Sequence, residues 1–237
     1  MKVTGVMLTF IDMPREAEAE FHEWYDLDHL PEIVGLPGVI SGQRYQAADN
    51  LMQFRASKEG APPIGEARHC SVYLLGDPDV AAVQARMTDL GKRLFAEKRM
   101  IRHGKVVFSR AFRLIHAYAA PRIRVSEDGR PHLRHKGLQV AMGSVPDPKD
   151  IPEATEWWHS SHYPDMLSVP GWAVALKCEP VGEEGQGKFL HLFLLDKAAD
   201  QAHAELNKVL PEWRATGRSP HPRGIYRRSF SGPLSRI

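Results

Sequence analysis

The sequence predicts an α+β protein built from two copies of a β-α-β-β-α-β unit that pack sheet to sheet. Three observations support this fold: an internal repeat, the same order of strand and helix candidates in each half, and a composition suited to a packed core. The chain has 237 residues, of which 43% are hydrophobic and 25% are charged. That length allows one large domain or two small ones, and that composition is typical of globular proteins.

The internal repeat is short but rich in informative residue types. Residues 23–39, EWYDLDHLPEIVGLPGV, align without a gap with residues 156–172, EWWHSSHYPDMLSVPGW, at an offset of 133. Tryptophan, histidine, proline and glycine are shared, so we interpret the match as a true repeat. The identical pairs are Glu23/Glu156, Trp24/Trp157, His29/His162, Pro31/Pro164, Pro37/Pro170 and Gly38/Gly171.

In the first half, apolar runs rich in β-branched and aromatic residues predict four strands. The repeat lies between the first and second strands and is predicted to be helical. A second helix is predicted over 79–98, where apolar residues recur at spacings of three and four. A polar loop with glycines separates the second strand from the third. The predicted strands are 3–11, 40–45, 70–77 and 106–118.

The second half presents the same elements in the same order. Its second helix is predicted over 200–214, again from apolar residues at helical spacing. Its predicted strands are 138–145, 173–178, 190–197 and 225–230. Each half therefore has the order of a ferredoxin-like unit, which the right-handed crossover rule permits.

These elements predict two units joined by a linker. We place the first unit at 1–120, the linker at 121–135 and the second unit at 136–237, because the linker is rich in Pro, Gly, Arg and His and has no apolar period. In the strand over 189–195 both alternating sets of side chains are largely apolar, so both faces of that sheet are expected to be covered. The sheet of the other half is the natural cover, which gives a pseudo-symmetric barrel.

Charge and cysteine content narrow the function classes. The 31 Lys and Arg residues nearly balance the 29 Asp and Glu residues, which argues against a dedicated nucleic-acid binder. Cys70 and Cys178 cannot form a disulfide framework or a four-cysteine zinc site. No stretch approaches 18 apolar residues, so no membrane span is predicted. We expect a cytoplasmic protein, either a monomer or a homodimer.

The repeated histidines are the leading candidates for chemistry. His29 and His162 each stand two residues before a proline, so we expect each to lie at the C-terminal end of a helix. One interpretation is a capping role, because an imidazolium there stabilises the helix dipole. The other is an acid or base that works near neutral pH. Tyr25, His159 and Tyr163 would then assist the proton transfer.

Glu156, His159 and His162 recur at spacings of three, which places them roughly along one helix face. Two histidines and a carboxylate can bind a metal. Exposed histidine pairs are common, however, and the H-E-x-x-H pattern is missing from the sequence. We therefore predict no metal site.

Cationic and aromatic residues form a second group of candidates. Arg44 and Lys177 occupy equivalent positions on the second predicted strands, where each would anchor a substrate carboxylate. The alternative is an ion pair with Glu32 or Asp165. Four side chains are predicted to pack between helix and sheet or else to form an aromatic wall for a planar ligand: Trp24, Trp157, Trp158 and Trp172. His191 lies in an apolar strand, where a buried histidine must be paired, and is a further candidate for substrate binding.

These residues together resemble a known family. The pattern E-x-x-F-x-x-W-Y-x-x-x-H-x-P, followed by P-G and a strand with a basic residue, is similar to the EthD-like branch of the dimeric α+β barrel superfamily. The residues that carry it are Glu18, Phe21, Trp24, Tyr25, His29, Pro31, Pro37, Gly38 and Arg44, and the second half matches at Trp157, Trp158, His162, Pro164, Pro170, Gly171 and Lys177. The resemblance implies two ferredoxin-like units in one barrel, with a site between sheet and helices near the motif histidine.

The superfamily includes haem peroxidases, chlorite-dismutating enzymes, cofactor-free quinol monooxygenases, isomerases and cyclases. From histidine chemistry we predict a lyase or isomerase of aromatic catabolism, without an organic cofactor, that acts on a small anionic aromatic compound. A quinol-type monooxygenase or haem enzyme is the second hypothesis, and a non-catalytic ligand-binding or stress-response barrel is the third. Nucleotide-binding and α/β-hydrolase motifs are missing from the sequence.

Overall fold

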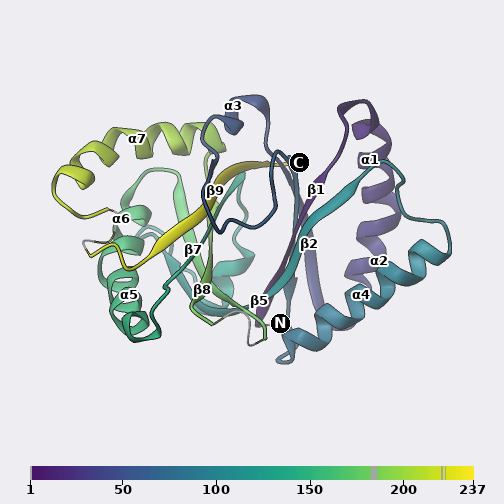
Figure 1. The fold of residues 1–237 in the computed structure, drawn as a ribbon, viewed down its shortest axis with the longest axis horizontal. Coiled ribbons are helices and arrows are strands. Elements are labelled where there is room, and N and C mark those ends of the chain that lie inside the picture. Colours follow the sequence, from purple (N-terminus) through teal and green to yellow (C-terminus); the bar gives the residue numbers. More distant parts are fainter. Residues whose placement is uncertain (1, 183–185, 220, 222) are drawn as a thin grey trace.

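This computed structural model describes residues 2–182, 186–219, 221 and 223–237. In this part of the chain eight long strands, each antiparallel to its neighbours, form a closed barrel (Figure 1). The first half contributes β1 (Gly5–Asp12), β2 (Val39–Gln46), β4 (His69–Leu75) and β5 (Lys105–Ala119). The second half contributes β6 (Gly137–Ser144), β7 (Trp172–Pro180), β8 (Lys188–Leu195) and β9 (Arg227–Arg236).

Each half forms its own four-stranded sheet, and the two sheets join at two seams. The order is β5-β1-β4-β2 in the first half and β9-β6-β8-β7 in the second, which is the ferredoxin-like order in both. One seam pairs β5 with β7. The other pairs β2 with β9, where Tyr45 faces Arg236 and Gln46 faces Ser235. The predicted fold of two ferredoxin-like units in one barrel is therefore confirmed.

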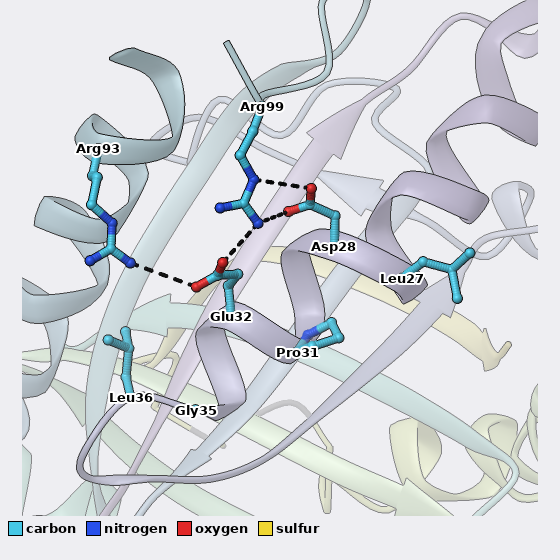
Figure 2. A pocket seen from close by; sticks show the side chains of 8 residues that line it. All are labelled: Leu27, Asp28, Pro31, Glu32, Gly35, Leu36, Arg93 and Arg99. Atoms are coloured by element: carbon cyan, nitrogen blue, oxygen red, sulfur yellow. Dashed lines mark hydrogen bonds and ion pairs between the residues drawn. The ribbon is translucent and has the colours of Figure 1, made fainter. Parts of the chain in front are cut away.

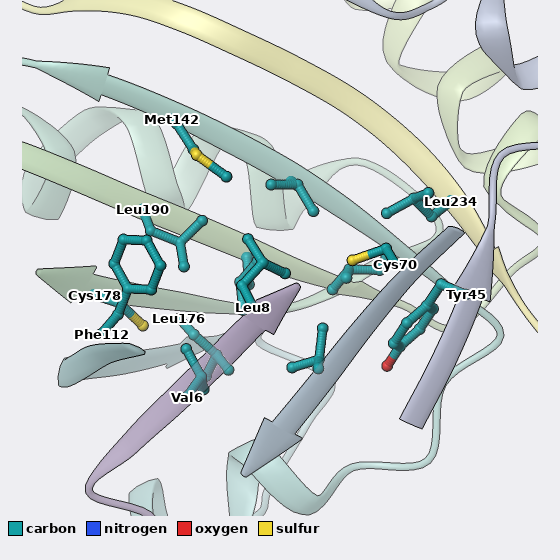
Figure 3. Packing of buried hydrophobic residues seen from close by; sticks show 14 of the residues in the cluster. Val6, Leu8, Tyr45, Cys70, Phe112, Met142, Leu176, Cys178, Leu190 and Leu234 are labelled. Carbon is teal, nitrogen blue, oxygen red and sulfur yellow. The ribbon is translucent and has the colours of Figure 1, made fainter. Parts of the chain in front are cut away.

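The inside of the barrel is a packed apolar core. Alternate residues of β1, namely Val6, Leu8 and Phe10, are fully buried in the same cluster as alternate residues of β6. Figure 3 shows side chains from both halves, including Met142 and Leu190, converging on this interior. The inner faces of both sheets are thus used for stability, which leaves the outer faces for the helices and for any ligand.

The helices cover the barrel on two opposite sides (Figure 1). The side of the first half carries α1 (Glu18–Trp24), α2 (Leu30–Val34) and α4 (Val80–Ala96). The other side carries α5 (Ile151–Trp157), α6 (Tyr163–Ser168) and α7 (Ala199–Ala215). The start of α4 is fixed by Asp79, whose side chain accepts a hydrogen bond of 3.0 Å from the amide of Ala82. The described residues contain no helix that is both long and apolar enough to span a membrane.

Some short elements and one strand differ from the sequence prediction. The strand predicted over 225–230 begins at Arg227 and continues to Arg236, because β6 and then β2 provide pairing partners along it. The segment 121–135 contains a short 3₁₀ helix, η3 (Glu127–His132). Four short elements were not predicted: α3 (Asp49–Met52), β3 (Ala56–Ser57), η1 (Arg15–Ala17) and η4 (Pro148–Asp150).

Candidate functional site

The repeated motif folds into a wide helical turn in both halves. Residues Tyr25–His29 (η2) and Trp158–His162 (η5) are π-helical and lie between two α-helical segments. The amide of Leu30 donates to the carbonyl of Tyr25, and the amide of Tyr163 donates to that of Trp158, each a bond across five residues. The prediction that His29 and His162 end their helices is therefore wrong. The wide turn gives the following proline room to continue the helix.

The π turn brings a tryptophan and a histidine of the motif face to face. The rings of Trp24 and His29 stack with centroids 4.7 Å apart, and those of Trp157 and His162 stack at 4.9 Å. The indole nitrogen of Trp24 also donates a 2.6 Å hydrogen bond to the carbonyl of Arg99. The two histidines therefore have the same local setting, and what differs between the halves is the space beside them.

A cavity of about 190 Å³ lies between the helices and the sheet of the first half. Trp24, Tyr25 and His29, three of the predicted site residues, line it. Its wall is otherwise mainly apolar and comes from β1, the two motif helices, α4, β4, β5 and the segment that precedes β5. The main apolar lining residues are Met7, Ile11, Phe21, Ile33, Met87, Met100, Ile101 and Val106.

Two pairs of hydroxyl groups supply most of the polar lining. The hydroxyls of Tyr25 and Tyr73 are 2.5 Å apart and buried, and the hydroxyls of Thr9 and Ser109 are 3.0 Å apart. Burial raises the pKa of both tyrosines, so both stay protonated near neutral pH. The side chain of Ser71 also hydrogen-bonds both tyrosines, so the Tyr25–Tyr73 pair belongs to a network of three hydroxyls.

His29 is the basic group of the cavity. Burial lowers its pKa to about 4, against the opposing effect of the nearby carboxylates of Asp28 and Glu32. The ring is therefore neutral at pH 7. Its Nδ1 atom is buried and has no hydrogen-bond partner among the described residues. A neutral imidazole with an unused ring nitrogen can accept a proton or a hydrogen bond from a ligand in the cavity.

The predicted cationic anchor lies behind this wall, not in it. The side chain of Arg44 is only 6% exposed; it donates a 2.7 Å hydrogen bond to Asp26, and its guanidinium carbon lies 4.6 Å from the centre of the Tyr25 ring. Its second nitrogen is 2.5 Å from Nδ1 of His22. Its ion-pair partner is thus Asp26 and not Glu32. No residue that lines the cavity, among those the structure describes, carries a charge at neutral pH.

Glu32 has other partners, on the outside of the same helix. A surface pocket of about 440 Å³ lies there, and in Figure 2 Arg99 contacts both Asp28 and Glu32 while Arg93 approaches Glu32. Arg99 donates to Asp28 at 2.8 Å and to Glu32 at 2.7 Å. These ion pairs tie the segment after α4 to the motif helix. That segment contributes Met100, Ile101 and Gly104 to the inner cavity.

In the second half the corresponding space is filled by side chains. Trp158 replaces Tyr25 in the repeat and is completely buried. Its ring packs against those of Phe189, His191 and Tyr226, with centroids 4.6 to 5.2 Å apart. The buried Tyr163 lies with its hydroxyl 2.5 Å from Nδ1 of His191. Burial also lowers the pKa of His162 to about 4 and that of His191 further.

Lys177 is buried beside this aromatic group. Its ammonium lies 5.0 Å from the centre of the Trp158 ring and 5.2 Å from that of Phe189, and it donates a 3.2 Å hydrogen bond to Thr155. Burial lowers its pKa. By the repeat offset, Thr155 stands where the first half has His22, and His159 stands where it has Asp26. The second half has therefore lost the carboxylate that pairs with the cation. The ion pair of Asp165 is with Arg218.

His159 is exposed on the surface, near the ring of Tyr118. The structure does not group it with Glu156 and His162 into a metal site, and the described residues contain no group of three or more His, Cys, Asp or Glu side chains placed to hold a metal ion.

Haem does not fit the first-half cavity. A cavity of about 150 Å³ accommodates a single benzene ring. The 190 Å³ measured here leaves room for one ring with small substituents, whereas haem carries four pyrrole rings. The space around His191 in the second half is taken up by Trp158 and Tyr226.

Sequence reasoning missed several residues that shape the cavity. Tyr73 lies in a strand that was predicted, and opposite Met7 in the register of β1 and β4. Alternation along that strand could have assigned it to the helix-facing side. Thr9 and Ser109 face each other across β1 and β5. Predicting this contact requires the register of the two strands and not only their positions in the sequence. Gly104 lies just before a predicted strand, and no sequence signal marks it.

The fold matches solved structures along the whole chain. No protein-family model and no curated protein matches the sequence. An anthrone oxidase-like protein superposes with a TM-score of 0.60 at 13% identity, covering 100% of this chain and 92% of that one. The chain has the dimeric α+β barrel fold. A protein described as a monooxygenase from Fusobacterium nucleatum has a TM-score of 0.57 at 10% identity, with coverages of 100% and 94%.

A third match is the encapsulated DyP-type peroxidase of Mycobacterium smegmatis, with a TM-score of 0.60 at 9% identity and coverages of 99% and 92%. All these identities are low, so they support the barrel fold and leave the reaction to be argued from the site.

Proposed function

We propose that the protein is an enzyme of the dimeric α+β barrel superfamily that deprotonates a small, neutral, hydroxylated ring compound in the cavity of the first half. The observation that carries this proposal is the neutral His29 with its unused Nδ1, in an otherwise mainly apolar cavity that also holds the Tyr25 and Tyr73 hydroxyls. The EthD-like branch and an origin by duplication of one unit are parts of the same proposal, supported by the repeat.

The lining supports a neutral substrate over the anionic one expected from the sequence. A carboxylate in this cavity would lose its hydration without a cation to replace it, because Arg44 already pairs with Asp26 outside the wall. A phenolic or quinol-type hydroxyl is uncharged at neutral pH and can donate to His29. The volume supports a single ring with small substituents.

The residues divide the proton transfer between them. His29 accepts the hydroxyl proton, which its neutral state allows at pH 7. Burial makes it a weak base in the empty cavity, and the oxyanion that forms beside it raises its pKa as the proton moves. The oxyanion that forms is stabilised by a hydrogen bond from the hydroxyl network of Tyr25, Tyr73 and Ser71, whose protons can rearrange toward it. Stacking on Trp24 fixes the plane of the imidazole. Burial of the site strengthens each of these interactions in comparison with water.

We favour oxygenation of the resulting anion by dioxygen over a lyase or isomerase reaction. An electron-rich ring anion can reduce dioxygen without an organic cofactor, and the apolar lining suits dissolved dioxygen. A ring carbon forms a bond to one oxygen atom and the O–O bond breaks. The second oxygen atom leaves as water with two hydrogens of the substrate, so that a phenol and dioxygen give a quinone and water. The anthrone oxidase-like and monooxygenase-described proteins that share the fold are consistent with this class.

The test is dioxygen consumption with a panel of monocyclic phenols and hydroquinones, each compared with the matching benzoate. We expect turnover of neutral ring compounds only, and a loss of about 100-fold or more in His29→Gln. His103→Gln is the control, since that histidine is exposed and does not line the cavity. Equal turnover by His29→Gln and wild type, or a preference for the benzoates, would overturn the proposal.

A further inference from the structure

The last strands of the two halves allow a residue-by-residue comparison of the open and the filled space. In the first half Ile11 pairs with Val106, directly after an irregularity in the register of β1 and β5. In the second half Gly143 pairs with Arg228, after the same irregularity in β6 and β9. Counting back two residues from each partner aligns Gly104 with Tyr226.

These two positions differ by the full volume of a tyrosine side chain. Gly104 lines the cavity of the first half and contributes no side chain. Tyr226 places its ring 5.2 Å from that of Trp158 and 5.6 Å from that of His191. A Cβ added at Gly143 would lie 2.7 Å from the Tyr226 ring, so the ring lies directly over that glycine. Gly143 and Trp158 correspond to Ile11 and Tyr25, which both line the open cavity.

The polar atoms of the filled half show that Tyr226 occupies space and is not held there by hydrogen bonds. The hydroxyl of Tyr226 is buried and has no partner among the described residues. The same is true of Nε1 of Trp158 and Nε2 of His191, which surround it. Buried polar atoms are normally satisfied, so three unsatisfied ones on three rings that pack together are consistent with a site whose polar groups lack a ligand.

We infer that residue 104 and its counterpart 226 decide which half binds a ligand: Gly104 keeps the site of the first half open, and Tyr226 closes an equivalent site in the second. The inference rests on the proposed function for the chemical class of the ligand, a neutral monocyclic phenol. Whether each half contains an open cavity does not depend on the proposed function. Any side chain at position 104 would limit the size of the ring that the first half accepts.

The residues can be exchanged without a backbone obstacle. Gly104 does not have a positive φ, so an L side chain suits its backbone. An added Cβ would displace the terminal methyl of Met13, which is the flexible end of its side chain, and its next neighbours are 3.5 Å away or more. Gly104→Tyr is therefore expected to fold and to place its ring in the cavity beside Ile11, whose side chain takes the place over which the Tyr226 ring lies at Gly143 in the second half.

The experiment counts ligand sites in four proteins by two probes. Xenon under pressure in crystals reports open apolar space, and 4-fluorophenol followed by fluorine NMR reports binding of the proposed ligand class. In wild type we expect each probe in the first half and not in the second, and in Gly104→Tyr we expect it in neither half. In Tyr226→Gly we expect it in both halves. In the double variant we expect it in the second half and not in the first. Tyr226→Phe is the matched control and is expected to behave as wild type.

The two probes separate the inference from the proposed function. Xenon that remains in the first half of Gly104→Tyr, or that is missing beside Gly143 in Tyr226→Gly, would overturn the inference. If Tyr226→Gly does not fold, Tyr226→Val opens a smaller space and is judged by the same criterion. A xenon pattern as expected, together with no 4-fluorophenol binding to wild type, would instead contradict the proposed ligand class and leave the inference standing.

Discussion

Acidification is the perturbation to which this protein is expected to respond most strongly. Of the 12 histidines, eight have a pKa below the ordinary value, and in each of them the largest cause is burial of the ring. They are His22, His29, His69, His135, His162, His191, His203 and His221. Folding therefore keeps these rings neutral in a pH range in which the unfolded chain protonates them.

The linkage between proton binding and folding gives the sign and the size of the change in unfolding free energy. Between pH 6.5 and 4 the unfolded state binds more protons than the folded state, so the free energy of unfolding falls as the pH falls. A pKa of about 4 at His29, His162 and His203 corresponds to about 3 kcal/mol for each ring below pH 4 and about 1.4 kcal/mol at pH 5.5. His29 and His162 keep partial exposure, and solvent reduces their share.

The total is large compared with the stability of a protein. If the contributions of His29 and His162 are halved for their exposure, the three rings still lower the free energy of unfolding by roughly 6 kcal/mol below pH 4. Typical free energies of unfolding are about 5–15 kcal/mol. Stability is thus present in full above pH 6.5 and is lost progressively towards pH 4. We expect urea unfolding between pH 8 and 4.5 to show a falling midpoint, with a pH slope below 6.5 that corresponds to uptake of several protons.

A matched pair of variants identifies the source. His203 is 8% exposed and its Nε2 lies 2.7 Å from Oε1 of Gln139. His203→Gln keeps a donor there but cannot be protonated, so the pH slope should fall by about one proton. His103→Gln, at an exposed position, is the control for the substitution itself. A free energy of unfolding that stays constant from pH 7 to 5 in wild type would refute the reasoning.

Two further predictions concern buried polar pairs. Tyr25→Phe and Tyr73→Phe should each lower the free energy of unfolding by about 1–2 kcal/mol, because each breaks the hydrogen bond between the two buried hydroxyls. The double variant should cost less than the sum of the two single variants. Additive free energies from urea unfolding would show that the hydroxyls are not coupled. Lys177→Met removes a buried cation that forms no ion pair with a carboxylate among the described residues, although Glu179 attracts it, and should leave stability unchanged or raise it. Arg44→Met breaks the bond to Asp26 and should cost about 2 kcal/mol. Thermal melts that show equal losses for both would contradict this difference.

Much of the architecture could be predicted from the sequence because its signals are local or repeated. Strand 5–12 and helix 80–96 follow from apolar periodicity, and the repeat shows that two halves share one order of elements. The π turn could not be predicted, since proline normally stops a helix and the wide turn that tolerates it has no distinct residue pattern. The position of Arg44 on a strand was predicted correctly, but the direction of its side chain depends on the register of β2 against the helix.

The cavity itself was beyond sequence reasoning because it depends on missing volume. Tyr73 and Gly104 come from segments far from the repeat, and they line one space only once β4, β1 and β5 are paired. A glycine before a strand is ordinary in any sequence. The role of Gly104 in the cavity can be recognised only when the pairing of β6 with β9 aligns it with Tyr226.

The packing of the two halves explains how the protein can keep a cavity. In the second half the buried residues between helices and sheet form one continuous cluster that includes Trp158, Phe193 and Trp213. In the first half they form two separate clusters, one around Tyr73 and Met87 and one around Phe21 and Tyr25. The cavity lies between these two and is lined by residues of both.

An unfilled space forfeits the contacts that its lining atoms would otherwise make. The two halves share the barrel core and both seams, so the stability of the filled half also supports the open one. This arrangement is consistent with the difference between the two halves. In the second half Trp158 and Tyr226 fill the space between helices and sheet and add packing contacts to the barrel, while the half with Tyr25 and Gly104 keeps an open cavity beside His29.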